Sequence, residues 1–139
     1  MLEKYIENFD PDAVISEVQK EHGCTRKQAM KILEKKIKKE PYYQSKIREA
    51  IEARYPDAYV RKIAQGIYSE GGIADLMVVL RGRYIALEVK RPVLGEPSKL
   101  QLENQRQVRV AGGVYEFVIW PEEAIAVIEA ALKNKQKEK

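Results

Sequence analysis

The first forty residues contain two short stretches in which apolar side chains recur at helical spacing. Asp10-Pro11 is a typical helix start, because proline in the first turn needs no partner for its missing N–H. Gly23 ends this stretch, and Thr25 opens a second one with a capping box. The apolar members of the two stretches are Val14, Ile15, Val18, Ala29, Ile32, Leu33 and Ile37. The pattern predicts a helical pair, either a helix-turn-helix reader of DNA or, more commonly, a packing appendage.

After Pro41 the apolar positions change from helical to alternating spacing and back again. The segments predicted as strands are 58–64, 73–80, 83–90 and 114–120, and the predicted helices are 41–55, 98–112 and one that begins at Pro121. We therefore expect an N-terminal helical extension over 1–40, then an α/β domain over 41–133. In that domain, helices flank a mixed central sheet. Residues 134–139 are expected to form a charged tail.

The composition of the 139-residue chain argues against several classes of protein. One cysteine, Cys24, and one histidine, His22, cannot form an internal disulfide, a Cys/His zinc site or a histidine-based triad. No apolar run is long enough to cross a bilayer, and no basic start followed by an apolar stretch marks a secretory signal. We expect a cytoplasmic, intracellular protein, with a viral or phage origin left open. Its chemistry must use carboxylates and lysine, with or without an oxygen-liganded metal.

The charge balance leans only weakly towards a polyanionic partner. The 25 Lys and Arg residues against 21 Asp and Glu residues give a net charge of +4. This value fits a DNA-binding protein and equally an ordinary charged surface. Division of the chain at Glu40 and Pro97 leaves each part close to neutral. The sequence therefore predicts no concentrated basic arm.

The central hairpin carries the most informative group of residues. With its tip at Arg81-Gly82, the register places Asp75 directly opposite Glu88, and Lys90 points to the same face. Facing carboxylates repel each other, and Lys90 compensates only one of them. A divalent cation bound by oxygen atoms, Mg²⁺ or Mn²⁺, would resolve this repulsion. The alternative is a solvated ion network at a strand end.

These residues stand in an order that resembles a known family. Gly72-Ile73-Ala74-Asp75 followed by Glu88-Val89-Lys90 looks like the Asp…Glu-x-Lys signature of the PD-(D/E)xK nucleases. The run from 44 to 123 is more narrowly similar to the VRR-NUC (virus-type replication-repair nuclease) family, with Ala74 in place of that family's proline. Ser98-Lys99-Leu100-Gln101 and Gly112-Gly113 match its next motifs. The resemblance implies a restriction-endonuclease-like αβββαβ core.

The same resemblance implies a function and roles for individual residues. It points to a Mg²⁺- or Mn²⁺-dependent DNA endonuclease, selective for branched or flapped DNA and acting in replication, repair or recombination. Asp75, Glu88 and the backbone carbonyl of Val89 would hold the metal, and Lys90 and Gln101 would complete the catalytic set. Because cutting a junction needs two sites, we expect a homodimer. The alternative is a catalytically weakened module on the same fold that binds DNA or a protein.

A second position, besides Ala74, departs from the family pattern. The family places a glutamate on the helix before the sheet, and our alignment puts Gln44 there, with Glu52 as the substitute acid. The cations expected to contact DNA are Arg61, Lys62, Arg91 and Lys99. Tyr42, Tyr43, Tyr68 and Tyr84 are each either base-stacking residues or ordinary core residues.

Overall fold

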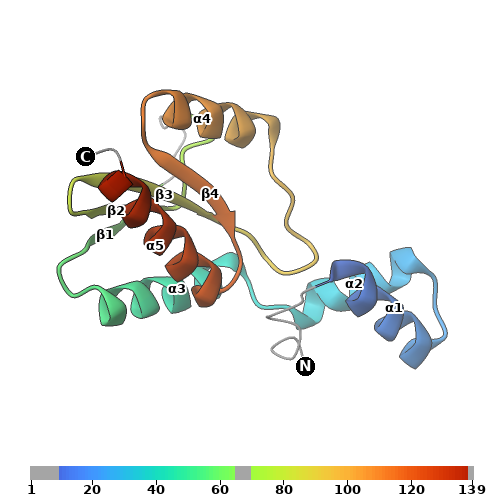
Figure 1. Ribbon diagram of the computed structural model, residues 1–139. Helices are drawn as coiled ribbons and strands as arrows, with labels where there is room; N and C mark the ends of the chain where they lie inside the picture. The colour runs from blue at the N-terminus through green and yellow to red at the C-terminus, as the bar shows by residue number, and fades with distance from the viewer. Residues whose placement is uncertain (1–9, 65–69, 138–139) are drawn as a thin grey trace.

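The computed structural model describes residues 10–64 and 70–137, and it shows an α/β unit with a helical pair beside it (Figure 1). In chain order the elements are α1 (Pro11–His22), α2 (Arg26–Lys36), α3 (Glu40–Arg54), β1 (Tyr59–Lys62), β2 (Leu76–Leu80), β3 (Arg83–Val89), α4 (Lys99–Val110), β4 (Val114–Val118) and α5 (Pro121–Lys137). This order confirms the predicted fold class. Each strand is shorter than predicted at one or both ends, and Tyr68 lies outside the described residues.

The four strands form one mixed sheet in the order β1-β2-β3-β4. The first three are antiparallel, whereas β4 lies parallel to β3, and α4 supplies the crossover that a parallel pair requires. Met77 pairs with Ala86, which confirms the predicted hairpin register. The tip residues Arg81 and Gly82 both have positive φ, as a two-residue hairpin turn demands.

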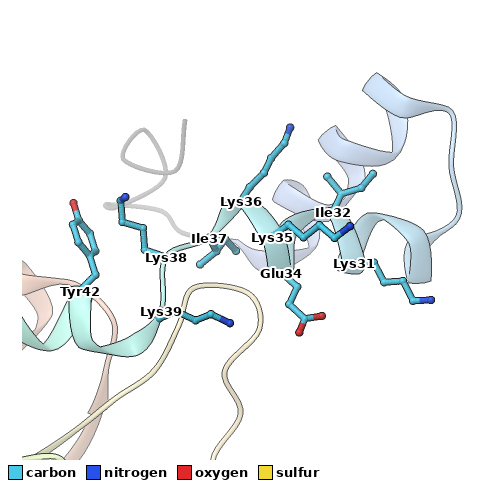
Figure 2. A pocket seen from close by; sticks show the side chains of 9 residues that line it. All are labelled: Lys31, Ile32, Glu34, Lys35, Lys36, Ile37, Lys38, Lys39 and Tyr42. Atoms are coloured by element: carbon cyan, nitrogen blue, oxygen red, sulfur yellow. The ribbon is translucent and has the colours of Figure 1, made fainter.

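The helical pair α1–α2 leads into α3 through a short connection that is rich in lysine. Between α2 and α3 lies an open pocket of about 1000 Å³, which we call the lysine pocket. Its lining residues, drawn in Figure 2, are Lys31, Ile32, Glu34, Lys35, Lys36, Ile37, Lys38, Lys39 and Tyr42. The prediction of no concentrated basic arm is therefore wrong: averaging over the first forty residues hid a local cluster.

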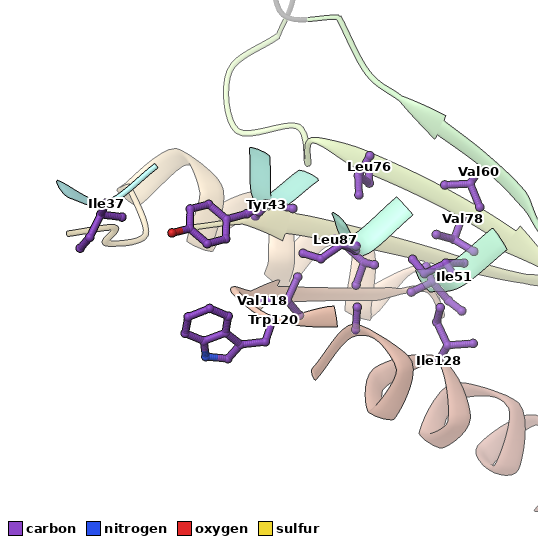
Figure 3. Packing of buried hydrophobic residues seen from close by; sticks show 14 of the residues in the cluster. Ile37, Tyr43, Ile51, Val60, Leu76, Val78, Leu87, Val118, Trp120 and Ile128 are labelled. Atoms are coloured by element: carbon purple, nitrogen blue, oxygen red, sulfur yellow. The ribbon is translucent and has the colours of Figure 1, made fainter. Parts of the chain in front are cut away.

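The main core lies between one face of the sheet and helices α3 and α5. Figure 3 shows Ile51 of α3 and Ile128 of α5 packed against strand residues such as Val78 and Leu87. On β3 the side chains alternate, so that Ile85, Leu87 and Val89 join this core. The other face of β3, which carries Ala86, packs with residues of α4 and β4 in a smaller cluster. The predicted polar residues of β3 belong to this second face.

The C-terminal helix is longer than its sequence pattern suggested. α5 runs to Lys137, so most of the expected tail over 134–139 is helix. Acidic residues Glu122 and Glu123 lie in its first turn, where the helix dipole favours them. Within the two described ranges, no helix is both long and apolar enough to span a membrane.

Candidate active site

The β2–β3 hairpin brings Asp75 and Glu88 into direct reciprocal contact. The backbone N–H of Asp75 donates to Glu88 Oε2 at 3.0 Å, and the backbone N–H of Val89 donates to Asp75 Oδ2 at 2.9 Å. Each carboxylate is thus fixed by the backbone of the facing strand. The predicted juxtaposition of the two acids is confirmed.

Lys90 and Gln101 complete a hydrogen-bonded cluster with Glu88. The Lys90 Nζ atom donates to Gln101 Oε1 at 2.7 Å and lies 3.7 Å from Glu88 Oε1. The amide of Gln101 donates to the same Glu88 oxygen at 2.6 Å. Gln101 therefore holds both the Lys90 ammonium and the Glu88 carboxylate. The family motif predicted a role for Gln101, whereas its position in the first turn of a helix alone did not.

The start of α4 explains why Gln101 has this orientation. Ser98 caps the helix, since its Oγ accepts from the Gln101 N–H at 3.1 Å and its own N–H donates to Gln101 Oε1 at 3.0 Å. Gly72 lets α4 approach closely, because it has a φ of 85° and an added Cβ would collide with the Leu100 carbonyl. The Tyr115 hydroxyl donates to the Gly72 carbonyl at 2.9 Å, which anchors the segment before Asp75.

Burial gives the cluster unusual electrostatics. Glu88 is 4% exposed and Lys90 is 9% exposed. Burial, then repulsion from Asp75, raise the pKa of Glu88 from 4.5 to about 7, although Lys90 and the Asp75 N–H oppose the change. A carboxyl that titrates near neutrality is ready to ionise when a cation binds beside it.

A further acid contributes to this field, and sequence reasoning missed it. The charge of Glu40 adds to the rise in the pKa of Glu88. Glu40 is the first residue of α3 and lies one helical turn before Gln44, at the spacing that continues through the buried Ile47 and Ile51. The signal for it in the sequence is an acid directly before a proline at a helix start, because proline and acidic residues are both favoured in the first turn.

The two residues predicted for the third acid position have different environments. Gln44 is 7% exposed, and its Oε1 is buried without a hydrogen-bond partner in the described part of the chain. Glu52 is exposed and accepts a hydrogen bond from Arg48 at 2.6 Å. The structure therefore does not bring Glu52 to the cluster, because its side chain lies on the solvent side of α3.

The donor set fits an oxygen-liganded cation in part. Asp75 Oδ2 and both oxygens of Glu88 accept hydrogen bonds, whereas Asp75 Oδ1 accepts none from the described residues. No group of three or more Asp, Glu, His or Cys side chains in residues 10–64 and 70–137 is already arranged around one point. The chemistry of Asp75, Glu88 and the nearby Glu40 nevertheless suits Mg²⁺ or Mn²⁺, which prefer carboxylate oxygens.

One of the cations predicted to contact DNA, Arg91, also makes structural contacts. Arg91 donates to the backbone carbonyls of Glu34, Ile37 and Lys38 at 2.9–3.0 Å, so its guanidinium closes the C-terminal end of α2. These bonds give Arg91 a structural role in holding the helical pair, and the prediction that it also binds DNA stays a prediction.

The remaining predicted cations are exposed. Arg61 stacks its guanidinium 4.1 Å from the centroid of the Tyr59 ring, and Lys62 follows it on β1. Lys99 lies in the first turn of α4, two residues before Gln101. Among these three exposed cations, Lys99 is thus the one closest in sequence to the cluster.

Comparison with known proteins bears on the fold. No family model matches the sequence, and no curated protein matches it. A solved structure described as "VRR_NUC domain" aligns with a TM-score of 0.51 and 24% sequence identity, over 63% of this chain and 95% of that chain. Likeness at this level of identity concerns the fold, and it agrees with the fold expected from the ordered motifs. This chain has the nuclease-like fold of a VRR_NUC domain.

Proposed function

We propose that this protein belongs to the VRR-NUC family and is a Mg²⁺- or Mn²⁺-dependent DNA endonuclease. The observation that carries the proposal is the buried Asp75–Glu88–Lys90–Gln101 cluster on this fold. A structural ion network would not need two carboxylates held together with only one nearby ammonium. A site built to hold a cation does need that arrangement.

In the proposed reaction, each residue has a distinct task. A bound divalent metal would supply charge neutralisation at the scissile phosphate and activation of water. Asp75, Glu88 and the Val89 carbonyl would hold it, with Glu40 as the third acid. Lys90 places its ammonium where negative charge develops during phosphodiester hydrolysis.

Gln101 acts on the other two groups of the cluster. By accepting from Lys90 and donating to Glu88, it holds the ammonium and the carboxylate in fixed positions. Glu40, whose charge acts on Glu88, is our candidate for the acid that Gln44 does not supply, and it favours the nuclease over a catalytically weakened module.

The direct test is nicking of supercoiled plasmid with Mg²⁺ and with EDTA. We expect wild type to nick only with the metal, and Asp75→Asn to lose at least a thousandfold in rate while keeping its fold. Glu52→Gln is the matched control, because this exposed acid lies away from the cluster. Mn²⁺ should also raise the melting temperature of wild type and not that of Asp75→Asn. Equal nicking by Asp75→Asn and Glu52→Gln contradicts the proposal.

We further propose that two copies act together on branched DNA. Tyr59, Val79 and Tyr84 are paired in register across three strands, and all are exposed, between 38% and 48%. Such an apolar row on a sheet face suits contact with a second copy. Sedimentation should show a dimer that Tyr84→Glu dissociates, whereas a monomer at all micromolar concentrations contradicts this assembly. Four-way junction and linear duplex substrates compared side by side test the selectivity.

A further inference from the structure

The positive charge of this chain is concentrated in one place. Residues 26–39 contain seven Lys and Arg residues and a single acid, Glu34. Their net charge of +6 exceeds the +4 of the whole chain, so the other 125 residues are together net −2. The segment 26–39 therefore accounts for the whole excess of positive charge in the chain, and it is the first place to look for a polyanion-binding surface.

Helix stability explains only part of this cluster. Lysines in the last turn of a helix interact favourably with its dipole, which accounts for Lys35 and Lys36. Lys38 and Lys39 follow the helix, and Lys31 lies more than one turn before its end. All five line the same pocket, and Figure 2 shows Lys36 and Lys38 pointing to the side on which the Tyr42 ring projects.

The Tyr42 ring gives the lysine pocket a flat apolar surface. The residue is 42% exposed, with the Lys38 and Lys46 ammonium groups 5.2 and 5.8 Å from the ring centroid. Its position is supported by the core. The Tyr42 ring packs edge to face against Tyr43, with ring centroids 5.2 Å apart, and Tyr43 packs in the same way against Trp120, with centroids 6.1 Å apart. An exposed ring on a rigid support, surrounded by ammonium groups, is the arrangement that stacks an unpaired base and binds its phosphates.

The lysine pocket adjoins the candidate active site through two covalent neighbours. Arg91, which binds the carbonyls of the pocket residues Glu34, Ile37 and Lys38, directly follows Lys90. In the second of these places, the pocket residue Lys39 directly precedes Glu40, whose charge acts on Glu88. The pocket and the candidate active site are therefore joined through chain neighbours at two places, Lys90–Arg91 and Lys39–Glu40.

We propose that the lysine pocket holds an unpaired DNA strand next to the active site, with one base stacked on Tyr42 and its phosphates on Lys36, Lys38 and Lys39. This inference rests on the proposed nuclease function for its substrate class. It assigns to the helical pair the task of recognising the single-stranded arm of a flapped or branched substrate. Duplex contacts through phosphates alone would use the lysines and leave the tyrosine without a role.

Fluorescence anisotropy in EDTA tests the phosphate contacts, with the full chain and a labelled fifteen-nucleotide oligothymidine. The variant carries Lys36→Gln, Lys38→Gln and Lys39→Gln. The control removes the same charge through Lys20→Gln, Lys27→Gln and Lys133→Gln, three exposed lysines outside the pocket. We expect at least a tenfold loss of affinity for the variant relative to the control. Its logarithmic salt dependence should also fall by about 2 units, since each phosphate contact on a single strand contributes about 0.7. Equal affinity of the two triple variants overturns the proposal.

The stacking contact has its own pair of variants. Tyr42→Leu should weaken oligothymidine binding roughly five- to a hundredfold and leave binding of a blunt twenty-base-pair duplex unchanged, whereas Tyr42→Phe should bind like wild type. If Tyr42→Leu weakens both ligands equally, or neither, the pocket does not read unpaired strands. Thermal melts of all variants identify any loss of folding.

Because these measurements need neither metal nor cleavage, they separate the two proposals. Plasmid nicking that is absent while pocket-dependent binding persists refutes the nuclease and leaves the strand-binding pocket standing. If metal-dependent nicking is normal and the pocket variants bind oligothymidine as the wild type does, the strand-binding proposal is refuted and the nuclease proposal stands.

Discussion

The Asp75–Glu88 cluster and the lysine pocket use charge in opposite ways. In the cluster, few charges are buried and fixed by backbone N–H groups, and the pKa of Glu88 rises to about 7. In the pocket, five lysines, all positively charged, line one open surface. Repulsion between exposed charges is weakened by solvent and salt, whereas repulsion between buried carboxylates is not. The cluster should therefore respond to pH and divalent cations, and the pocket to ionic strength.

After the loss expected for Asp75→Asn, the next largest effect is expected at Glu40, whose charge acts on Glu88. Glu40→Gln should lower the rate of plasmid nicking about a hundredfold, on the order of 2.7 kcal/mol, because it removes a hard ligand near Glu88. Glu49→Gln, an exposed acid on the same helix, is the control. Single-strand binding in EDTA should stay unchanged in both. Identical nicking rates for the two variants would exclude Glu40 from the site.

A pH series on the metal-free protein sharpens the contrast between the regions. Since the folded-state pKa of Glu88 is raised to about 7, the folded protein keeps a proton that the unfolded chain has lost. The stability from this proton is complete below about pH 4.5 and disappears as pH rises through 7. We expect the free energy of unfolding to fall by roughly 1–3 kcal/mol between pH 5 and pH 8.

The reference for this series is Glu88→Gln, whose free energy of unfolding should not show the fall of roughly 1–3 kcal/mol between pH 5 and pH 8. The free energy of unfolding of both proteins is measured by urea melts in EDTA at fixed ionic strength. A wild-type curve parallel to that of Glu88→Gln would show that Glu88 does not titrate in this range.

Arg91 joins the two regions, and its replacement tests how tightly they are held together. Arg91→Ala should destabilise the protein by about 1–2 kcal/mol, because three carbonyls at the end of α2 lose a charged donor. Arg91→Lys should recover only part of this, since one ammonium cannot reproduce the fork of a guanidinium. Hydrogen exchange should locate the loss in α1 and α2. Exchange that changes uniformly along the chain would contradict a local anchoring role.

The smallest effect is expected at Gln44. Its Oε1 is buried without a partner in the described part of the chain, so Gln44→Met should leave the metal-free stability unchanged or raise it by up to about 1 kcal/mol. A thermal melt in EDTA measures this. A clear destabilisation would mean that the amide makes a necessary contact.

Features set by nearby residues were predictable from the sequence, and those set by tertiary packing were not. The opposition of Asp75 and Glu88 followed from hairpin register, because a two-residue turn at Arg81-Gly82 fixes every pair along two strands. The place of Glu40 depends on how α3 approaches the sheet, and no local pattern encodes that approach.

Arg91 and the lysine pocket show the same limit. Arg91 reaches carbonyls 53 to 57 residues earlier in the chain, a pairing that spacing rules do not address. The lysines were visible in the sequence, but their concentration became clear only when the segment 26–39 was taken by itself rather than with the more acidic residues before it.

The two-residue turn between β2 and β3 also has a consequence for the order of folding. Asp75 and Glu88 are only 13 residues apart, and a hairpin of this kind closes within microseconds because its loop is short. The acids therefore meet early, while water still surrounds them and their repulsion is weak. Gln101 donates to Glu88 from α4, which follows the hairpin in the chain, so we expect α4 to cover the two acids after the hairpin has formed. On this order, the chain meets the full electrostatic penalty of its own site late in folding, when the hairpin is already in place to hold it.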